Sequence, residues 1–196
     1  METYRLFIAV EVGPDARAEL AAAQSRLKRG ALPVRWVAPE AIHLTLHFLG
    51  ETDVARLDQL GAAIRAALAG QTKMALRLDS AGAFPNLRRP SVIWAGVGGA
   101  TAMLERSQTA IGAALEALGL PRETRPFRAH LTLGRAHRDA APAQLERIGA
   151  AVRALPPFAP APWDVERVVL FRSELRPSGP VYTELVSCQL SVASCD

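Results

Sequence analysis

Two identical tetrapeptides, His-Leu-Thr-Leu, stand at residues 43–46 and 130–133 of this 196-residue chain. The chain has only four histidines, and two of them open these tetrapeptides. Histidine can give or take a proton near neutral pH because its unperturbed pKa is ~6.5. The threonine two residues later carries a hydroxyl that can donate a hydrogen bond to a phosphoryl oxygen. These residue types indicate acid–base chemistry at a tetrahedral anion.

Each His-x-Thr unit places its two polar side chains on one face if it lies on a β-strand, where residues i and i+2 are ~6.5–7 Å apart. His43 and Thr45 then share a face, as do His130 and Thr132, while the leucines point the other way into a core. If the two copies face each other, one histidine deprotonates an attacking hydroxyl or water and the other protonates the leaving oxygen. Such a positioned group typically contributes ~10²–10⁴-fold to a rate.

The chain also repeats its pattern of secondary structure. The second tetrapeptide follows the first by 87 residues, and the same offset lays Phe7 on Trp94. Strand and helix signals, read from alternation, three- and four-residue apolar spacing and Gly/Pro breaks, give the order β-α-β-α-β twice. The expected strands are 4–12, 42–49, 74–79, 91–97, 128–135, 166–172 and 181–191, and the expected helices are 14–29, 54–69, 101–118 and 142–154.

This repeat predicts an α+β fold with two pseudo-twofold-related lobes, whose antiparallel sheets face a central groove. We expect one bilobal domain over residues 1–196, with lobe 1 at about 1–85 and lobe 2 at about 90–196, and with room for strand exchange between them. The Pro- and Arg-rich segment 83–91 is the expected crossover between the lobes.

Composition and charge narrow the class of protein. The N-terminus carries charges at positions 2, 5 and 11, and no apolar run approaches the ~20 residues of a membrane span. Cys188 and Cys195 are the only cysteines, which favours a reducing compartment. We therefore expect a cytoplasmic monomer without a membrane anchor. The net charge of +4 is carried almost entirely by arginine, which suits recognition of phosphate.

The paired motifs and their surroundings resemble a known family. The stretches "LFIAVEV", "HLTLHFLG" and "RPFRAHLTLGR" are similar to the RNA 2′,3′-cyclic phosphodiesterase branch of the 2H phosphoesterase superfamily, also described as LigT-like or 2′-5′ RNA ligase-like. The match runs from about Tyr4 to Leu190. The resemblance implies a bilobal α+β fold with a central groove. It also implies hydrolysis of a 2′,3′-cyclic phosphate at an RNA end to a 2′-phosphomonoester.

The resemblance further implies a role for each matching residue. His43 would be the proton donor and His130 the proton acceptor, while Thr45 and Thr132 would hold the phosphate. Arg135, two residues after the second tetrapeptide, would contact the phosphate or the RNA backbone. The expected partners are RNA ends that bear a 2′,3′-cyclic phosphate, including tRNA halves, or small cyclic nucleotides. No metal or cofactor is expected, because the substrate can bring its own nucleophile or a strained ring.

Strand alternation makes separate predictions for the residues that flank the motifs. It argues against Arg135 sharing the face of His130 unless the strand ends or bulges at Gly134. His47 has the parity of His43, which predicts a position at the rim of the groove or on the surface. Phe48 has the parity of the leucines, which predicts a place in the core.

Two other functions use the same groove. Joining of RNA halves through a 2′-5′ linkage is the same ring opening with a hydroxyl of the second RNA in place of water. An RNA-end binding module with little turnover is the alternative from another class. The presence of both histidines favours an enzyme, because a protein that only binds has little reason to hold both.

Overall fold

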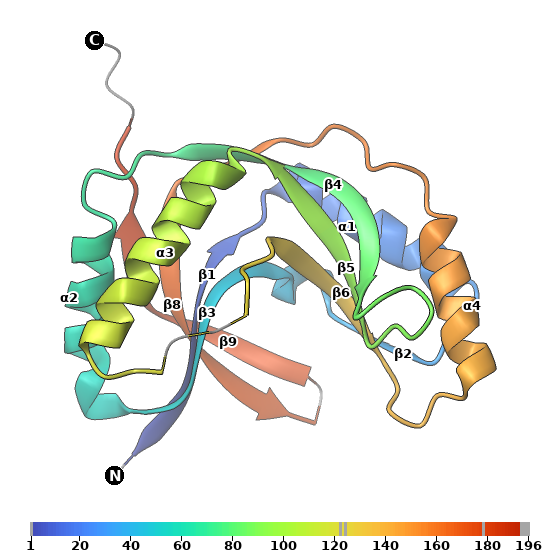
Figure 1. Ribbon diagram of the computed structural model, residues 1–196, viewed down its shortest axis with the longest axis horizontal. Coiled ribbons are helices and arrows are strands. Elements are labelled where there is room, and N and C mark those ends of the chain that lie inside the picture. The colour runs from blue at the N-terminus through green and yellow to red at the C-terminus, as the bar shows by residue number, and fades with distance from the viewer. Residues whose placement is uncertain (1, 122, 124, 178, 193–196) are drawn as a thin grey trace.

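The computed structural model describes residues 2–121, 123, 125–177 and 179–192, so Cys195 lies outside the described residues. Within them the chain forms a nine-stranded sheet with four α-helices packed against it (Figure 1). In chain order the elements are β1 (Thr3–Glu11), α1 (Pro14–Lys28), β2 (Val34–Trp36), β3 (His43–Asp53), α2 (Leu57–Ala67), β4 (Met74–Phe84), β5 (Val92–Gly99), α3 (Thr101–Ala117), β6 (His130–Ala136), α4 (Pro142–Arg153), β7 (Trp163–Val165), β8 (Arg167–Arg176) and β9 (Gly179–Gln189).

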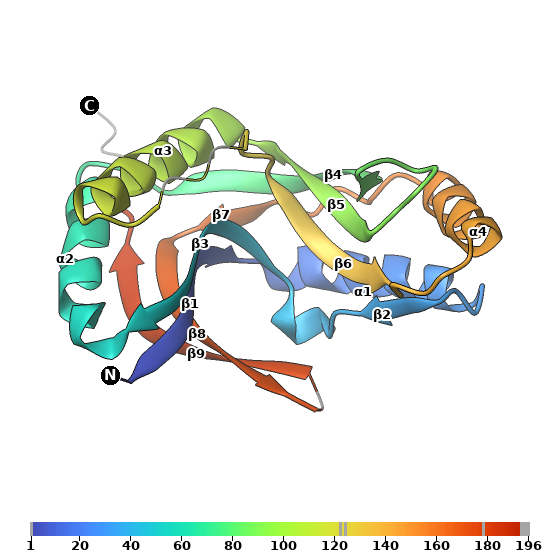
Figure 2. The same cartoon turned by 60° about the horizontal axis from the view of Figure 1, so that its bottom comes forward.

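The sheet has the strand order β7-β4-β5-β6-β3-β1-β8-β9, and β2 adds to β6. Every pair of neighbouring strands is antiparallel. The two halves of the sheet meet between β3 and β6, where Leu44 pairs with Leu131, and the sheet curls across this junction (Figure 2). The predicted α+β class with antiparallel sheets is therefore confirmed.

The two halves of the sequence exchange strands in the sheet. Strand β4 pairs with β5 of the second repeat, while β8, near the C-terminus, pairs with β1. Residues 83 and 84 end β4 and residues 85–91 form the loop of the β4–β5 hairpin, so the predicted crossover at segment 83–91 is wrong. The alternation that marks residues 74–79 is interrupted by a register shift between Leu78 and Ala81, which hides the rest of β4 in the sequence.

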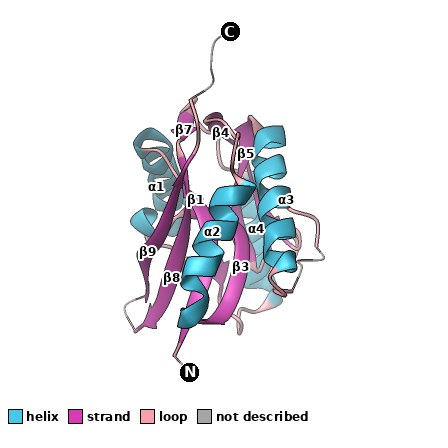
Figure 3. Ribbon diagram, turned by 90° about the vertical axis from the view of Figure 1, so that its left-hand side faces the viewer, coloured by secondary structure: helices cyan, strands magenta, loops and turns pink. Residues whose placement is uncertain are grey.

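One face of the sheet packs against all four helices and forms the main core, and we call it the helix face. Its buried side chains include Ile8, Leu44, Ile93 and Leu131, which pack with helix residues such as Leu20, Ile64, Ile111 and Ile148. At one end of the molecule α2 and α3 pack side by side (Figure 3). None of the helices in the described residues is both long and apolar enough to cross a membrane.

The opposite side, which we call the open face, carries the polar residues of both tetrapeptides. All four motif leucines are buried on the helix face, none of them more than 4% exposed. Burying one leucine is worth ~1.5–3 kcal/mol, and a slip of one residue would move all of them to the open face. Burial of the leucines therefore determines where the histidines and threonines point.

Candidate active site

Each tetrapeptide ends in a β-bulge. In β3, Thr45 pairs with Ala9 of β1 while His47 pairs with the preceding Ile8, so Leu46 is an extra residue. In β6, Leu133 is the extra residue at the corresponding position of the repeat. A bulge places two successive residues on the same face and reverses the alternation beyond it. The residues that follow each tetrapeptide therefore lie on the faces opposite to those that simple alternation predicts.

The bulge at Leu46 overturns the predictions for the two residues after it. His47 lies on the helix face, where its Nε2 donates a hydrogen bond to the carbonyl oxygen of Gln108 on α3 at 2.7 Å. Phe48 lies on the open face with 70% of its surface exposed, and its ring centre is 6.3 Å from that of Phe7. His47 is thus not at the groove rim, and Phe48 is not in the core.

The bulge at Leu133 decides the position of Arg135. Gly134 pairs with the core residue Ile93, and Arg135 pairs with Val92, so Arg135 lies on the same face as His130. The sequence allows Arg135 to share the face of His130 only if the strand ends or bulges at Gly134. The bulge does occur, but one residue earlier, at Leu133. The repeat offset of 87 equates Arg135 with Phe48, so a cation on one side of the junction corresponds to a phenyl ring on the other.

The Leu44–Leu131 pair brings the two motifs together. In an antiparallel register one step from this pair, His43 lies across from Thr132 and Thr45 across from His130, all on the open face. The charge of His130 also acts to lower the pKa of His43. The structure therefore gathers the four motif side chains where the halves of the sheet meet.

Both histidine rings are oriented by the same backbone hydrogen bond. The Nδ1 of His43 donates to the carbonyl oxygen of Ala41 at 2.9 Å, and that of His130 donates to the carbonyl oxygen of Arg128 at 2.7 Å. Ala41 and Arg128 are related by the repeat offset. Because a carbonyl oxygen only accepts, Nδ1 carries the proton in each ring. Nε2 is then the atom available to exchange a proton with a substrate.

Aromatic rings hold the two imidazoles in place. The ring of His43 stacks on Phe7 at 4.6 Å between centres and meets the edge of Tyr182 at 5.1 Å. The ring of His130 meets Phe84 edge-on at 5.0 Å. Phe7 is itself part of a small apolar cluster on the open face with Ala9, Val169 and Phe171. These contacts restrict the rings and remove water from one side of each.

Burial is the largest cause of a lowered pKa at both His43 and His130. The hydrogen bonds to Ala41 and Arg128 oppose it, since they raise the pKa of the ring that donates. The charge of Arg135 lowers the pKa of His130 further. Each imidazole without a bound anion therefore favours its neutral form more than a free histidine does.

Gln24 is a positioning residue that sequence reasoning missed. It lies on α1, only 1% exposed, and its Nε2 donates to the carbonyl oxygens of Val37 at 2.7 Å and Leu133 at 2.8 Å. It therefore holds the carbonyl of the bulged residue in β6. The available signal was a glutamine on the apolar stripe between Leu20 and Leu27, at helical spacing.

Two His-x-Thr units, related by an internal repeat and brought together on the open face of one curled antiparallel sheet, define a two-histidine phosphoesterase type of protein. The family model of the LigT-like phosphoesterases matches the chain twice, at residues 10–94 and 98–182. The chain belongs to this family, and each match contains one tetrapeptide. The resemblance read from the sequence motifs is therefore confirmed.

Individual relatives agree with this assignment. RNA 2′,3′-cyclic phosphodiesterases of Methanothermobacter thermautotrophicus and Thermus thermophilus are 30% and 36% identical, over 92% of this chain and 96% and 87% of theirs. A crystal structure of a Thermus thermophilus protein matches with a TM-score of 0.78 at 31% identity, over 97% of this chain and all of the other. E. coli LigT in complex with 3′-AMP matches with a TM-score of 0.78 at 25% identity, over 96% of this chain and 99% of the other.

Proposed function

We propose that the protein hydrolyses 2′,3′-cyclic phosphate ends of RNA to 2′-phosphomonoesters, with His43 and His130 as the acid and the base. Thr45, Thr132 and Arg135 hold the phosphate. Membership of the LigT-like family and the names of the enzymes similar to this chain support the reaction type.

The observation that carries the proposal is the matched anchoring of the two imidazoles. Each Nδ1 is committed to a backbone carbonyl, and each ring lies across the β3–β6 junction from the threonine of the other motif. This leaves two Nε2 atoms available for proton transfer on the open face, which also carries the two threonine hydroxyls. A phosphate between them has one proton-transfer group available on either side of phosphorus.

In the reaction, His130 accepts a proton from water as the water oxygen forms a bond to phosphorus. The bond between phosphorus and O3′ breaks, and His43 gives its proton to O3′. The products are a 2′-phosphomonoester and a free 3′-hydroxyl, and a proton exchange with solvent restores both histidines. The positive charge of Arg135 favours the neutral form of His130, which suits the proton acceptor. Negative charge on the bound phosphate favours the protonated His43 that a donor requires.

The displacement at phosphorus asks the protein only for two proton transfers and for donors to the phosphate oxygens, so we propose that it needs neither a metal nor a cofactor. In the described part of the chain, no three His, Cys, Asp or Glu side chains come together as a set of metal ligands. Turnover in the presence of EDTA tests this part of the proposal directly.

The test is turnover of a short RNA that ends in a 2′,3′-cyclic phosphate, with EDTA present and the product end mapped. We expect a 2′-phosphate product from the parent protein and a loss of ~10²–10⁴-fold in both His43→Ala and His130→Ala. His137→Ala is the matched control, because this histidine is exposed beyond the end of β6 and should leave turnover unchanged.

Other outcomes select among the alternatives. A folded parent protein without hydrolysis would contradict the proposal, and the same RNA with an added 5′-hydroxyl RNA would then test 2′-5′ joining. Binding of the RNA with neither reaction would identify an RNA-end binding module. Activity that survives in either histidine variant would refute the assignment of acid and base to this pair.

A further inference from the structure

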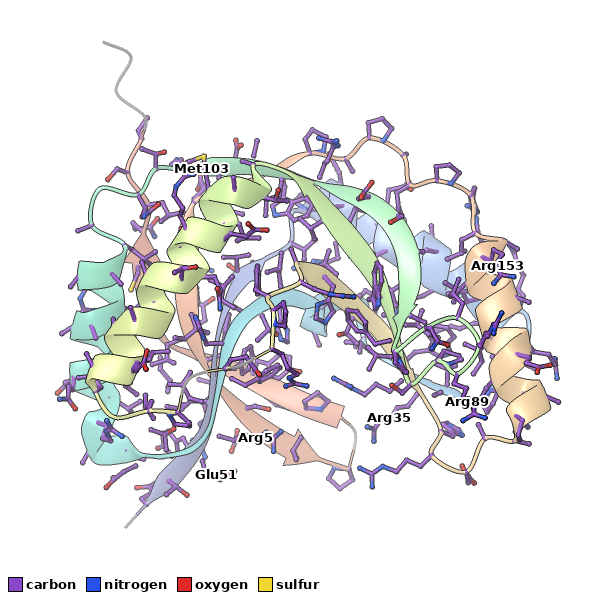
Figure 4. All side chains as sticks on the ribbon, in the orientation of Figure 1. Arg5, Arg35, Glu51, Arg89, Met103 and Arg153 are labelled. Atoms are coloured by element: carbon purple, nitrogen blue, oxygen red, sulfur yellow. The ribbon has the colours of Figure 1, made fainter. Side chains whose placement is uncertain are left out.

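Two arginines face each other across neighbouring strands beside the site. Strand β2 pairs with β6 so that Arg35 lies opposite Arg135. Val34 and Trp36 flank Arg35 on β2, and both point to the helix face. A Cβ added to Gly134 on that face would contact both of their side chains. Since side chains alternate along a strand, Arg35 points to the open face, beside Arg135. Arg35 is exposed and extends outward at the edge of the sheet (Figure 4).

This pairing is unfavourable without an anion. Directly opposite residues in an antiparallel pair have Cα atoms ~4.5–5.5 Å apart, and like charges at that position repel. Across the part of the chain that the structure describes, neither Arg35 nor Arg135 has an ion pair with a carboxylate. Other arginines do, as in the pairs Arg125–Glu123, Arg167–Glu184 and Arg172–Glu174. Two adjacent unneutralised guanidinium groups are suited to a phosphate, which each can bind with two hydrogen bonds.

The position of the pair relative to the histidines indicates which phosphate it binds. Thr132 and Arg135 are about 7 Å apart along β6, because the extra residue Leu133 leaves only two steps between their partners on β5, and Arg35 lies on the strand beside Arg135. Arg135 lies on the same face as His130, and its positive charge acts to lower the pKa of both His130 and Tyr182. The exposed guanidinium of Arg35 extends outward at the edge of the sheet, beside Arg135 rather than between the two histidines.

We propose that Arg35, together with Arg135, forms a second phosphate subsite that binds the phosphodiester next to the reacting cyclic phosphate. This inference rests on the proposed function and makes it more specific. The substrate is then an RNA chain end with at least two nucleotides, and the chain extends from the β3–β6 junction toward β2. A free cyclic nucleotide lacks the phosphodiester that this subsite binds.

The experiment compares kcat/KM for a trinucleotide that ends in a 2′,3′-cyclic phosphate with kcat/KM for a nucleoside 2′,3′-cyclic monophosphate. In Arg35→Gln we expect the ratio of the two values to fall about tenfold, the effect of losing a hydrogen bond to a charged group. The salt dependence for the trinucleotide should also become shallower, by about 0.7 in the slope of log kcat/KM against log salt concentration.

Arg153→Gln is the matched control, because it removes the same charge from an exposed position at the end of α4, away from β2 (Figure 4). It should leave the ratio unchanged. The melting temperature of Arg35→Gln should not fall, since the substitution relieves the repulsion from Arg135. An unaltered ratio in Arg35→Gln, or an equal loss for both substrates, would overturn the second subsite.

Binding separates a failure of this inference from a failure of the proposed function. Fluorescence anisotropy with a trinucleotide that ends in a 3′-phosphate needs no turnover. If the parent protein hydrolyses neither substrate, the proposed function fails, while weaker binding by Arg35→Gln than by Arg153→Gln still supports the subsite. Equal binding by the two variants would refute it.

Discussion

Replacing Gln24 with glutamate tests whether the β6 bulge depends on one buried amide. The substitution keeps the shape of the side chain but replaces the Nε2 donor with an oxygen. That oxygen would face the carbonyl oxygens of Val37 and Leu133, which Nε2 now contacts at 2.7 and 2.8 Å. The introduced carboxyl can avoid repulsion only by keeping its proton, because the position is 1% exposed.

The expected loss of stability has two parts. A protonated carboxyl has one O–H donor in place of two N–H donors, so one hydrogen bond is lost at a net cost of about 1 kcal/mol. Burial next to two carbonyls raises the pKa of the carboxyl in the folded state above its unfolded value of ~4.3. Stability is then retained below that value and falls by ~1.4 kcal/mol per pH unit as pH rises toward the folded pKa. Between pH 5 and pH 7 the loss is about 2.7 kcal/mol, provided that the folded pKa exceeds 7.

Urea unfolding at pH 5, 6 and 7, followed by circular dichroism, measures this loss as a change in the free energy of unfolding. Gln59→Glu is the matched control, because Gln59 is exposed on α2 and its replacement should show no comparable pH dependence. Against a typical total of ~5–15 kcal/mol, the expected loss is easily resolved. Parallel pH dependences for Gln24→Glu and Gln59→Glu would refute the role of Gln24 in holding the carbonyl of Leu133.

Three further perturbations have definite expected results. Arg135→Gln should move the acidic limb of the kcat/KM–pH profile to higher pH, because loss of the cation raises the pKa of His130; a shift to lower pH would contradict this. Phe48→Ala should change the free energy of unfolding by less than about 0.5 kcal/mol, since the ring is exposed, yet lower kcat/KM for RNA about tenfold if a base stacks on it. Gly149→Ala should lower the melting temperature by several degrees in a thermal scan, because its Cβ would collide with the carbonyl of Leu87.

Much of the fold could be predicted because its signals are local. The helix that opens at Pro14 and the strand that contains His43 both lie within a few residues of their expected bounds. Strand β7 was missed because it has only three residues, Trp163–Val165, and follows a proline-rich segment. The extension of β4 through Gly82 to Phe84 was missed because a register shift breaks its alternation.

The candidate site, too, was predicted correctly only where its signals lie within one short strand segment. Alternation in a pleated strand correctly placed His43, Thr45, His130 and Thr132 on one face, since each is separated from its partner by a single buried leucine. Beyond the tetrapeptides the same rule failed at His47 and Phe48. A bulge arises from the register with the neighbouring strand, and that register is not visible within the strand itself.

The sequence by itself determined the reactive groups, their pairing within each unit and the repeat that supplies two copies, because these depend on residue identity and short-range spacing. Tertiary structure alone decided that Leu44 meets Leu131, that Arg135 shares the face of His130 and that Gln24 reaches the carbonyl of Leu133. These contacts join residues separated by 87 or more positions, or depend on the register between two strands. They are determined only when burial of the leucines and the pairing of distant strands are satisfied together.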